Sequence, residues 1–246
     1  MSTLYIVATP IGNLEDISLR AIRILSEVDF VLCEDTRVSG VLLHHYDIKT
    51  KKISYHQHSN SKKTDYILDL LGEGKNMAVI TDAGTPGISD PGGKLIQAVI
   101  NRFGDDVKIE SVPGPTAITA ALSISGIPTD KFIFMGFPPH KKGRQTFLKK
   151  IIISEFPVVV YESKHRIIKF LEELIRLSEI EKIDSELENK KIKKIKKIKN
   201  LQSVVVCREI SKMHETVYRG DIEKIILEIK SDKNHQKGEF VVIIGK

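Results

Sequence analysis

The sequence has little cysteine and no long apolar run. Its 246 residues include two cysteines, Cys33 and Cys207, each inside an apolar segment. Two cysteines are too few for a disulfide framework or a cysteine-based zinc site, so both thiols are expected to pack in the core. No apolar segment approaches the roughly 20 residues that span a bilayer, and no basic stretch precedes the short apolar segment at the N-terminus. We therefore expect a cytoplasmic protein.

Two common phosphate-binding motifs are also missing. The dinucleotide motif G-x-G-x-x-G occurs nowhere in the chain. The P-loop pattern fails in GISDPGGKL, because Ile88 stands where its first glycine belongs and Leu95 follows Lys94. A phosphate cradle built from backbone N–H groups is therefore not expected.

The net charge of +6 has a local origin. Residues 190–199 read KKIKKIKKIK and hold seven lysines and no acid, so the rest of the chain carries 6 − 7 = −1. Such a run is usually a solvated surface segment, although it can also hold phosphates. Both interpretations stay open.

Hydrophobic periodicity changes along the chain. In the first half, strand-like runs at 4–9, 30–35, 52–55, 77–81 and 107–112 alternate with helix-like stretches near 16–27, 61–72, 92–103 and 116–125. This alternation predicts a mostly parallel sheet wrapped by helices. After residues 127–131, five strand-like runs are separated by only three expected helices, and two of the runs near 203–220 suggest a hairpin in a mixed sheet. We place a domain boundary near 127–131.

Glycine and proline collect where three of these strands end. The runs at 4–9, 77–81 and 107–112 lead into PIGN, DAGTPGISDPGG and PGPT. Ligands of open α/β sheets bind outside the carboxyl ends of the strands, so these loops are expected to converge on one crevice that holds a small molecule. Prolines remove N–H groups and leave carbonyls, which suits a ligand with hydrogen-bond donors and positive charge, such as S-adenosylmethionine. The alternative is that they are only tight turns between strands and helices.

Eight ordered motifs carry a resemblance to a known family. They are TPIGNLEDISLRA, CEDTR, DAGTPGISDPG, VPGPTA, FMGFPP, YESKHRI, REISKMHET and KGEF. From residue 4 to about 245 the chain resembles the tetrapyrrole-methylase superfamily, and within it the bacterial enzymes that methylate a cytidine 2'-hydroxyl in small-subunit (16S) ribosomal RNA.

The resemblance implies a fold and an activity. It implies two α/β domains, at 1–128 and 129–246, with S-adenosylmethionine held between them. It further implies transfer of a methyl group to a ribose 2'-hydroxyl in the ribosomal decoding region, and a homodimer. A Lys/Ile-rich insertion near 178–202 departs from the family and is expected to loop out at the surface. Many relatives continue into a small C-terminal helical domain. The lysine run is a candidate replacement for the RNA binding that this domain would supply.

The superfamily's cofactor contacts can be carried over onto matching positions. They fall on Pro10, Asp82, Gly84, Thr85, Ile88, Thr116 and Ala117 in the first half, and on Tyr161, Cys207, Lys237 and Gly238 in the second.

The chemistry needs a base for the hydroxyl proton and cations for phosphates. We expect Asp35 to accept the proton of the 2'-hydroxyl or to orient that hydroxyl, and Arg37 to clamp a phosphate, with Glu162 and Glu209 as further catalytic candidates. His165, Arg166, Arg208 and Lys212 are expected to contact RNA. For each residue a plainer interpretation exists: Asp35 and Arg37 can stabilise a turn, and His165 can begin a helix over 165–177.

Three other interpretations are open to the sequence. A small-molecule methylase would use the same cofactor loops, and a non-catalytic RNA-binding module would need none of them. The YHQH segment places His56 and His58 on one strand face, but no third metal ligand is evident, so no metal site is expected.

Overall fold

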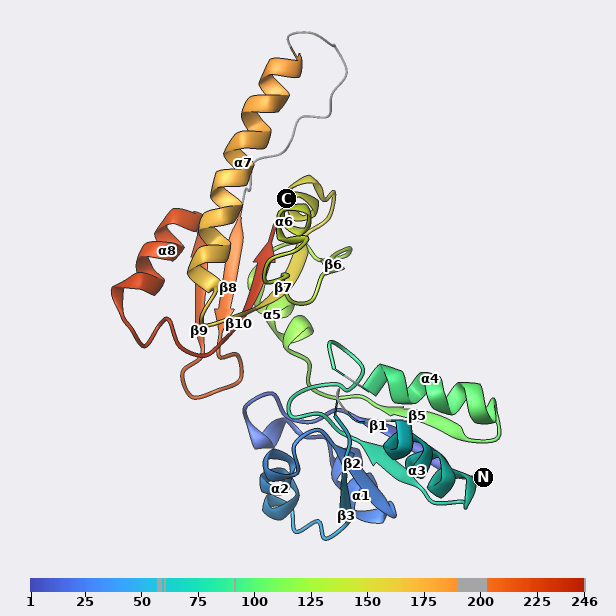
Figure 1. Ribbon diagram of the computed structural model, residues 1–246. Helices are drawn as coiled ribbons and strands as arrows, with labels where there is room; N and C mark the ends of the chain where they lie inside the picture. Colours follow the sequence, from blue (N-terminus) through green and yellow to red (C-terminus); the bar gives the residue numbers. More distant parts are fainter. Residues whose placement is uncertain (57–58, 60, 91, 190–202, 246) are drawn as a thin grey trace. The chain divides into compact units, whose positions relative to one another are not determined.

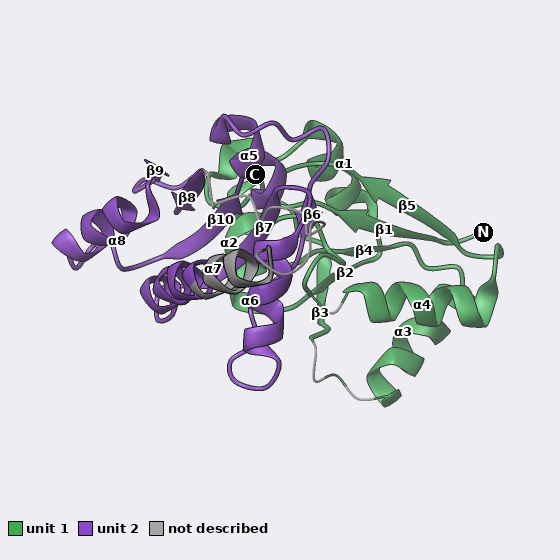
Figure 2. Cartoon of the chain, turned by 90° about the horizontal axis from the view of Figure 1, so that it is seen from above, with its two compact units in different colours: residues 1–116 green, residues 117–246 purple. Residues whose placement is uncertain are grey.

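The computed structural model describes residues 1–56, 59, 61–90, 92–189 and 203–245, with the backbone alone for 180–189. The chain forms two compact units, Met1–Thr116 and Ala117–Lys246 (Figure 2). This division falls before the boundary expected near 127–131, because helix α5 (Ala117–Ser125) packs against strand β10 (Glu239–Ile244) of the second unit.

The first unit contains a five-stranded parallel sheet in the order β3-β2-β4-β1-β5. Its strands are β1 (Thr3–Val7), β2 (Phe30–Cys33), β3 (Lys51–Ser54), β4 (Met77–Val79) and β5 (Lys108–Val112). The predicted parallel sheet is confirmed. Strand β4 lies between β1 and β2, so the strand that leads into CEDTR is not a direct neighbour of the first strand. A chain that returns to the sheet through a helix need not insert its next strand beside the last one.

Helices cover both faces of this sheet. They are α1 (Leu19–Glu27), α2 (Thr36–His45), α3 (Ser61–Gly72) and α4 (Gly92–Phe103), with a 3₁₀ turn at Leu14–Asp16. Buried residues of α1 and α2 pack on one face, and those of α3 and α4 on the other. Strand residues alternate between these two cores, as when Leu32 faces one core while Val31 and Cys33 face the other. Helix α2 is not expected from the sequence, since Gly40 interrupts its apolar pattern.

The second unit has a mixed sheet in the order β6-β7-β10-β8-β9. Its strands are β6 (Ile133–Phe134), β7 (Val158–Ser163), β8 (Val204–Arg208), β9 (Thr216–Gly220) and β10. Only β6 and β7 pair in parallel, and β8 and β9 form the expected hairpin pair. Helices α6 (Arg144–Ile153), α7 (Ile167–Asn189) and α8 (Ile222–Ser231) supply apolar residues to its core.

Helix α7 runs much further than the expected 165–177 (Figure 1). It continues to Asn189, so the first part of the Lys/Ile-rich insertion is helical rather than looped out. The sequence contains neither glycine nor proline between Pro157 and Gly220, so nothing in it stops a helix of Glu, Lys, Leu and Ile residues. Throughout the described residues, no helix combines the length and apolarity needed to cross a membrane.

Candidate active site

The loops that follow β1, β4 and β5 meet at one edge of the first sheet. The N–H of Thr9 donates to the carbonyl of Gly84 over 2.9 Å, and the N–H of Gly84 donates back over 3.1 Å. The hydroxyl of Thr85 donates to the carbonyl of Pro115 over 3.1 Å, tying the loop after β4 to the loop after β5. The prediction that the three loops converge is confirmed.

Two glycines allow this close approach. Gly84 has a φ of 87°, and an added Cβ would lie 3.4 Å from Cγ2 of Ile11 and 3.7 Å from the carbonyl oxygen of Pro115. An added Cβ on Gly114 would lie 3.0 Å from Cβ of Ala8. A side chain at Gly84 would therefore meet both backbone strain and neighbouring atoms.

Asp90 closes the long loop on itself. Both of its carboxylate oxygens accept from the N–H of Gly87 at 2.8 Å, and Oδ1 also accepts from the N–H of Gly92 at 2.7 Å. N–H groups at a helix start commonly hold phosphates, but here the chain's own carboxylate accepts from the N–H of Gly92, the first residue of α4. Asp90 is a functional residue that was not expected from the sequence, although an aspartate just before a helix is a helix-start signal.

The first-half cofactor residues carried over from the resemblance lie on these loops. They are Pro10 after β1, Asp82, Gly84, Thr85 and Ile88 after β4, and Thr116 and Ala117 after β5. Pro10 is buried, whereas Ile88 is exposed. Except for Ala117, which begins α5 in the second unit, these residues lie on loops at one edge of the first sheet, and the Ile88 side chain is exposed.

Three carboxylates gather where β2 and β4 end. The N–H of Asp35 donates to Oδ1 of Asp82 over 3.2 Å. The hydroxyl of Thr81 donates to Oε2 of Glu34 over 3.3 Å. Because β2 is the direct neighbour of β4, the CEDTR motif borders the DAGTPG loop rather than the loop after β1.

Asp35 caps helix α2. Its Oδ1 accepts from the backbone N–H of Arg37 at 2.8 Å, and its Oδ2 pairs with Nη2 of Arg37 at 2.7 Å. These hydrogen bonds lower the pKa of Asp35 to about 2. A carboxylate that holds its proton so weakly is a poor base, so the geometry favours the plainer, turn-stabilising interpretation of Asp35. The Arg37 side chain remains 88% exposed.

Glu34 and Asp82 are better proton acceptors. Desolvation, then the negative charge of Asp82, raises the pKa of Glu34. Desolvation, with a smaller contribution from the charge of Asp35, also raises the pKa of Asp82. Carboxylates with raised pKa values bind a proton more readily at neutral pH, which is what a general base requires.

Glu162 lies in a buried ion network of the second unit. Its Oε1 is 3.0 Å from Nε of Arg166, and its Oε2 is 3.9 Å from Nη1 of Arg144. Arg144 is also paired with Glu173 at 2.7 Å. Burial raises the pKa of Glu162, whose side chain is completely inaccessible. These contacts argue against the expected catalytic role of Glu162 and the expected RNA contact of Arg166.

Two neighbours of this network remain accessible. His165 is exposed in the turn before α7. Tyr161 is partly buried, and its ring lies edge-on to Phe134 at 4.9 Å and tilted toward Phe137 at 5.4 Å.

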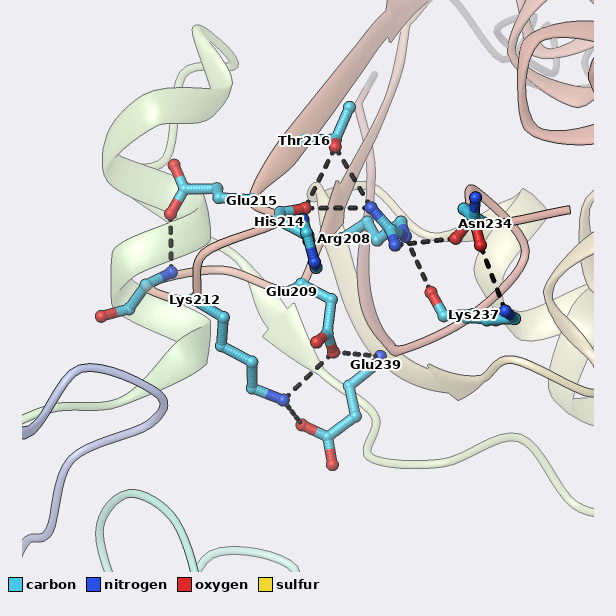
Figure 3. A network of polar contacts seen from close by, with 10 residues as sticks. Arg208, Glu209, Lys212, His214, Glu215, Thr216, Asn234, Lys237 and Glu239 are labelled. Atoms are coloured by element: carbon cyan, nitrogen blue, oxygen red, sulfur yellow. Dashed lines mark hydrogen bonds and ion pairs between the residues drawn. The ribbon is translucent and has the colours of Figure 1, made fainter. Parts of the chain in front are cut away.

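Arg208 ties together three carbonyls beyond the end of β8 (Figure 3). It donates to the carbonyls of Lys237 at 2.7 Å, Asn234 at 2.7 Å and His214 at 2.9 Å. With 5% of its surface exposed, Arg208 is placed to organise these loops, which argues against the expected RNA contact.

Lys212 is bound between two carboxylates in the same network (Figure 3). Its Nζ lies 3.1 Å from Glu209 and 2.8 Å from Glu239. Glu209, at a φ of 50°, also accepts from the N–H of Glu239 and covers Gly238, where an added Cβ would fall 2.5 Å from Cγ of Glu209. Glu209 therefore acts as a loop organiser here, and much of the charge of Lys212 is compensated.

Cys207 is fully buried in β8, between β9 and β10, and burial raises its pKa to about 11. The thiol is a core residue, as its apolar surroundings in the sequence predicted. A cofactor contact at this position would have to use backbone atoms.

Some sequence-based expectations fall outside the described residues. His58 and the lysine run at 190–199 are among them. Among the residues that are described, no group of three or more His, Cys, Asp or Glu side chains is arranged to hold a metal ion.

The chain is similar to a methylase family and to named members of it. Residues 3–226 match the family described as Tetrapyrrole (Corrin/Porphyrin) Methylases. "Ribosomal RNA small subunit methyltransferase I" of Hydrogenobaculum sp. is 41% identical over 99% of this chain and 95% of the relative. The proteins of that name from Thermotoga maritima and Escherichia coli O157:H7 are each 36% identical, over 100% and 98% of this chain and over 99% and 77% of their own lengths.

Solved structures share the fold at low identity. Uroporphyrin-III-C-methyltransferase from Thermus thermophilus superposes with a TM-score of 0.64 at 18% identity, covering 100% of this chain and 95% of that one. A cobalt precorrin-4 methyltransferase gives 0.65 at 19% identity, covering 99% and 94%. The chain belongs to the tetrapyrrole (corrin/porphyrin) methylase family, and within it to the group of ribosomal RNA small subunit methyltransferase I proteins.

Proposed function

We propose that this protein transfers a methyl group from S-adenosylmethionine to the 2'-hydroxyl of a cytidine in the decoding region of small-subunit ribosomal RNA. The observation that carries the proposal is 36–41% identity, over nearly the whole chain, to proteins named for methylation of that RNA. The low-identity structural neighbours support the fold alone.

The edge of the first sheet suits a cationic methyl donor. Glu34, Asp35 and Asp82 place negative charge there, and Asp90 already accepts from the N–H of Gly92, the first residue of α4. An anionic ligand would be repelled, whereas the ammonium and sulfonium of S-adenosylmethionine would be attracted. When bound, this cofactor supplies a methyl group that is already activated by the sulfonium.

The cofactor residues of the proposal are those carried over by family resemblance. They are Pro10, Asp82, Gly84, Thr85, Ile88, Thr116, Ala117, Tyr161, Cys207, Lys237 and Gly238. Their task is to hold the donor so that the attacking oxygen, the methyl carbon and the sulfur stand in line, because alignment supplies much of the acceleration in such a displacement.

We assign the proton-accepting role to Glu34 in place of Asp35. A ribose hydroxyl must lose its proton as it attacks, and the raised pKa of Glu34 makes it the better acceptor. Asp35 then positions α2 and holds Arg37, whose exposed guanidinium is free to clamp an RNA phosphate. His165 is also exposed and can contribute to RNA binding.

The assembly and the substrate form are also proposals. We expect a homodimer, which light scattering on the eluting protein would test. We expect the RNA to be recognised within an assembled or assembling small subunit. Labelled cofactor offered with free RNA and with small subunits from a strain lacking the gene would show which form accepts the methyl group.

The deciding experiment maps the modification. Ribosomal RNA from a deletion strain should lack one 2'-O-methylcytidine, and the purified protein should restore it on isolated subunits. Transfer of label to a tetrapyrrole but not to RNA would favour a small-molecule methylase. Absence of calorimetric heat with S-adenosylmethionine would favour a non-catalytic RNA-binding module.

A further inference from the structure

A basic segment on the second unit has no part in the chemistry described above. Residues 131–154 contain no aspartate or glutamate. Their lysines are all exposed: Lys131, Lys141, Lys142, Lys149 and Lys150. In the described part of the chain, Lys141 and Lys142 form no ion pair with a carboxylate. Their charge is therefore available to an outside partner.

Two arginine side chains form hydrogen bonds to backbone carbonyls of this segment. Nη1 of Arg144 donates to the carbonyl of Pro139 at 3.0 Å, and Nη1 of Arg166 donates to the carbonyl of Pro138 at 3.0 Å. The side chains of both arginines are largely buried, at 6% and 17% exposure. Consecutive carbonyls of one loop are thus fixed, and the prolines add their own stiffness.

Burying these charged side chains carries a desolvation cost in folding free energy. Oε2 of Glu162 and Nη2 of Arg144 are buried and have no hydrogen-bond partner among the described residues. Buried ion networks with unsatisfied atoms contribute little net stability, because desolvation offsets the attraction between the charges. What the network does provide is a fixed position for the loop immediately before Lys141 and Lys142.

Aromatic rings accompany the lysines. Phe137 is 53% exposed and packs against Tyr161, which is itself supported by Phe134. Lys131 lies 5.6 Å from the ring of Phe156, another exposed phenylalanine. Exposed rings beside unpaired cations are the composition of surfaces that bind single-stranded nucleic acid, where bases stack and phosphates meet lysines.

We propose that residues 137–142, the FPPHKK loop, form an RNA-binding surface of this protein. Lys141 and Lys142 contact phosphates, Phe137 stacks on an unpaired base, and Arg144 and Arg166 position the loop from inside the fold. The inference rests on the proposed function in taking RNA as the substrate. It moves RNA binding from Arg166 and Arg208, whose guanidinium groups are hydrogen-bonded to backbone carbonyls, to side chains that are exposed.

The test measures RNA binding as a function of salt. The double variant Lys141→Ala/Lys142→Ala is compared with Lys224→Ala/Lys233→Ala, which removes the same charge from two exposed lysines on and after α8. A single-stranded RNA oligonucleotide and isolated small subunits are the probes. The loop variant should reduce the slope of log affinity against log salt by about 0.7 for each lysine with the oligonucleotide. The control variant should keep the wild-type slope.

A second variant tests stacking. Phe137→Ala should weaken oligonucleotide binding by about 5- to 100-fold without changing the salt slope, as expected for loss of a stacked base. Leu227→Ala, a truncation of another exposed apolar residue, serves as its control. Affinity for S-adenosylmethionine, measured by calorimetry, should be unchanged in the two lysine variants and in Leu227→Ala.

The outcomes separate this inference from the proposed function. If the wild-type protein methylates small subunits while the loop and control variants bind RNA with equal slopes, the surface is wrong and the enzyme assignment stands. If the loop variants lose RNA binding but the wild-type protein transfers no methyl group, the surface stands and the enzyme assignment fails. Equal weakening by the loop and control variants would indicate only general charge attraction and would overturn the proposal.

Discussion

Gly84 gives a direct test of the cofactor loops. Gly84→Val should abolish S-adenosylmethionine binding, because a side chain at a φ of 87° strains the backbone by roughly 1–2 kcal/mol and pushes against Ile11 and Pro115. Calorimetry measures the affinity. Gly93→Ala is the matched control, since an added Cβ there meets nothing within 4 Å.

Strain alone can be separated from loss of the site. Gly74 has the same φ of 87° in a turn outside the site, with open space around it. Gly74→Ala should lower the unfolding midpoint and leave cofactor affinity unchanged. Unchanged affinity in Gly84→Val would place the cofactor elsewhere.

Substitutions of Glu34 and Asp35 should affect turnover to different extents. Glu34→Gln should lower the rate by ~100-fold or more, the usual contribution of a positioned base, with cofactor affinity preserved. Asp35→Asn should have a much smaller effect, because asparagine is also a good N-cap for α2. Single-turnover methylation of small subunits measures both. A ~100-fold loss in Asp35→Asn with little loss in Glu34→Gln would return the role to Asp35.

The pH dependence follows from the same assignment. A base acts in its deprotonated form, so the rate should fall as the pH drops through the pKa of Glu34, which is raised above its ordinary value of 4.5. The low-pH limb should be lost in Glu34→Gln. Asp35, with a pKa of about 2, would leave the rate flat down to a much lower pH. The position of that limb therefore distinguishes the two carboxylates.

The loop leading into α4 depends on Asp90. Asp90→Ala should leave the N–H groups of Gly87 and Gly92 without an acceptor, so hydrogen exchange at both should speed up and cofactor affinity should fall by about 10-fold, a loss of roughly 1.4 kcal/mol. The vacated N–H groups should then attract an anion. Sulfate should raise the unfolding midpoint of this variant more than that of the wild-type protein.

Asp69→Ala is the matched control for Asp90. It removes an exposed carboxylate from α3 that pairs with Arg102, and it lies outside the site. It should show the wild-type response to sulfate and unchanged cofactor affinity. An equal sulfate response in Asp90→Ala and Asp69→Ala would contradict the self-capping role of Asp90.

The lysine run dominates the charge of the molecule as a whole. Without residues 190–199 the formal charge falls from +6 to −1, since the run holds seven lysines. If these lysines hold phosphates, replacing them with glutamine should weaken RNA binding and flatten its salt dependence by roughly 0.7 to 0.9 for each phosphate released. Cofactor affinity should not change. A wild-type salt slope after neutralisation would favour a solvated segment and leave RNA binding to the FPPHKK loop.

The local sequence pattern was enough to predict most of the strands and helices of the first unit. It was also enough to predict that the loops after β1, β4 and β5 meet. The apolar runs at 30–35 and 77–81 became β2 and β4, because short apolar runs between polar segments are typical of buried strands. Gly84 could be identified from the sequence, because many glycines and prolines directly after a buried strand indicate a loop whose backbone conformation is restricted. The eight motifs located the family because their order is far more specific than any one of them.

Partnership between distant residues was decided only by the tertiary structure. The sequence cannot say that β4 inserts between β1 and β2, and this insertion brings Glu34 and Asp35 beside Asp82. Nor can it say that Glu162 and Arg208 are buried, because a charged residue at a strand end looks the same in sequence whether it faces solvent or a compensating partner. Proton affinity and accessibility depend on neighbours from other parts of the chain, and those neighbours exist only once the sheets have formed.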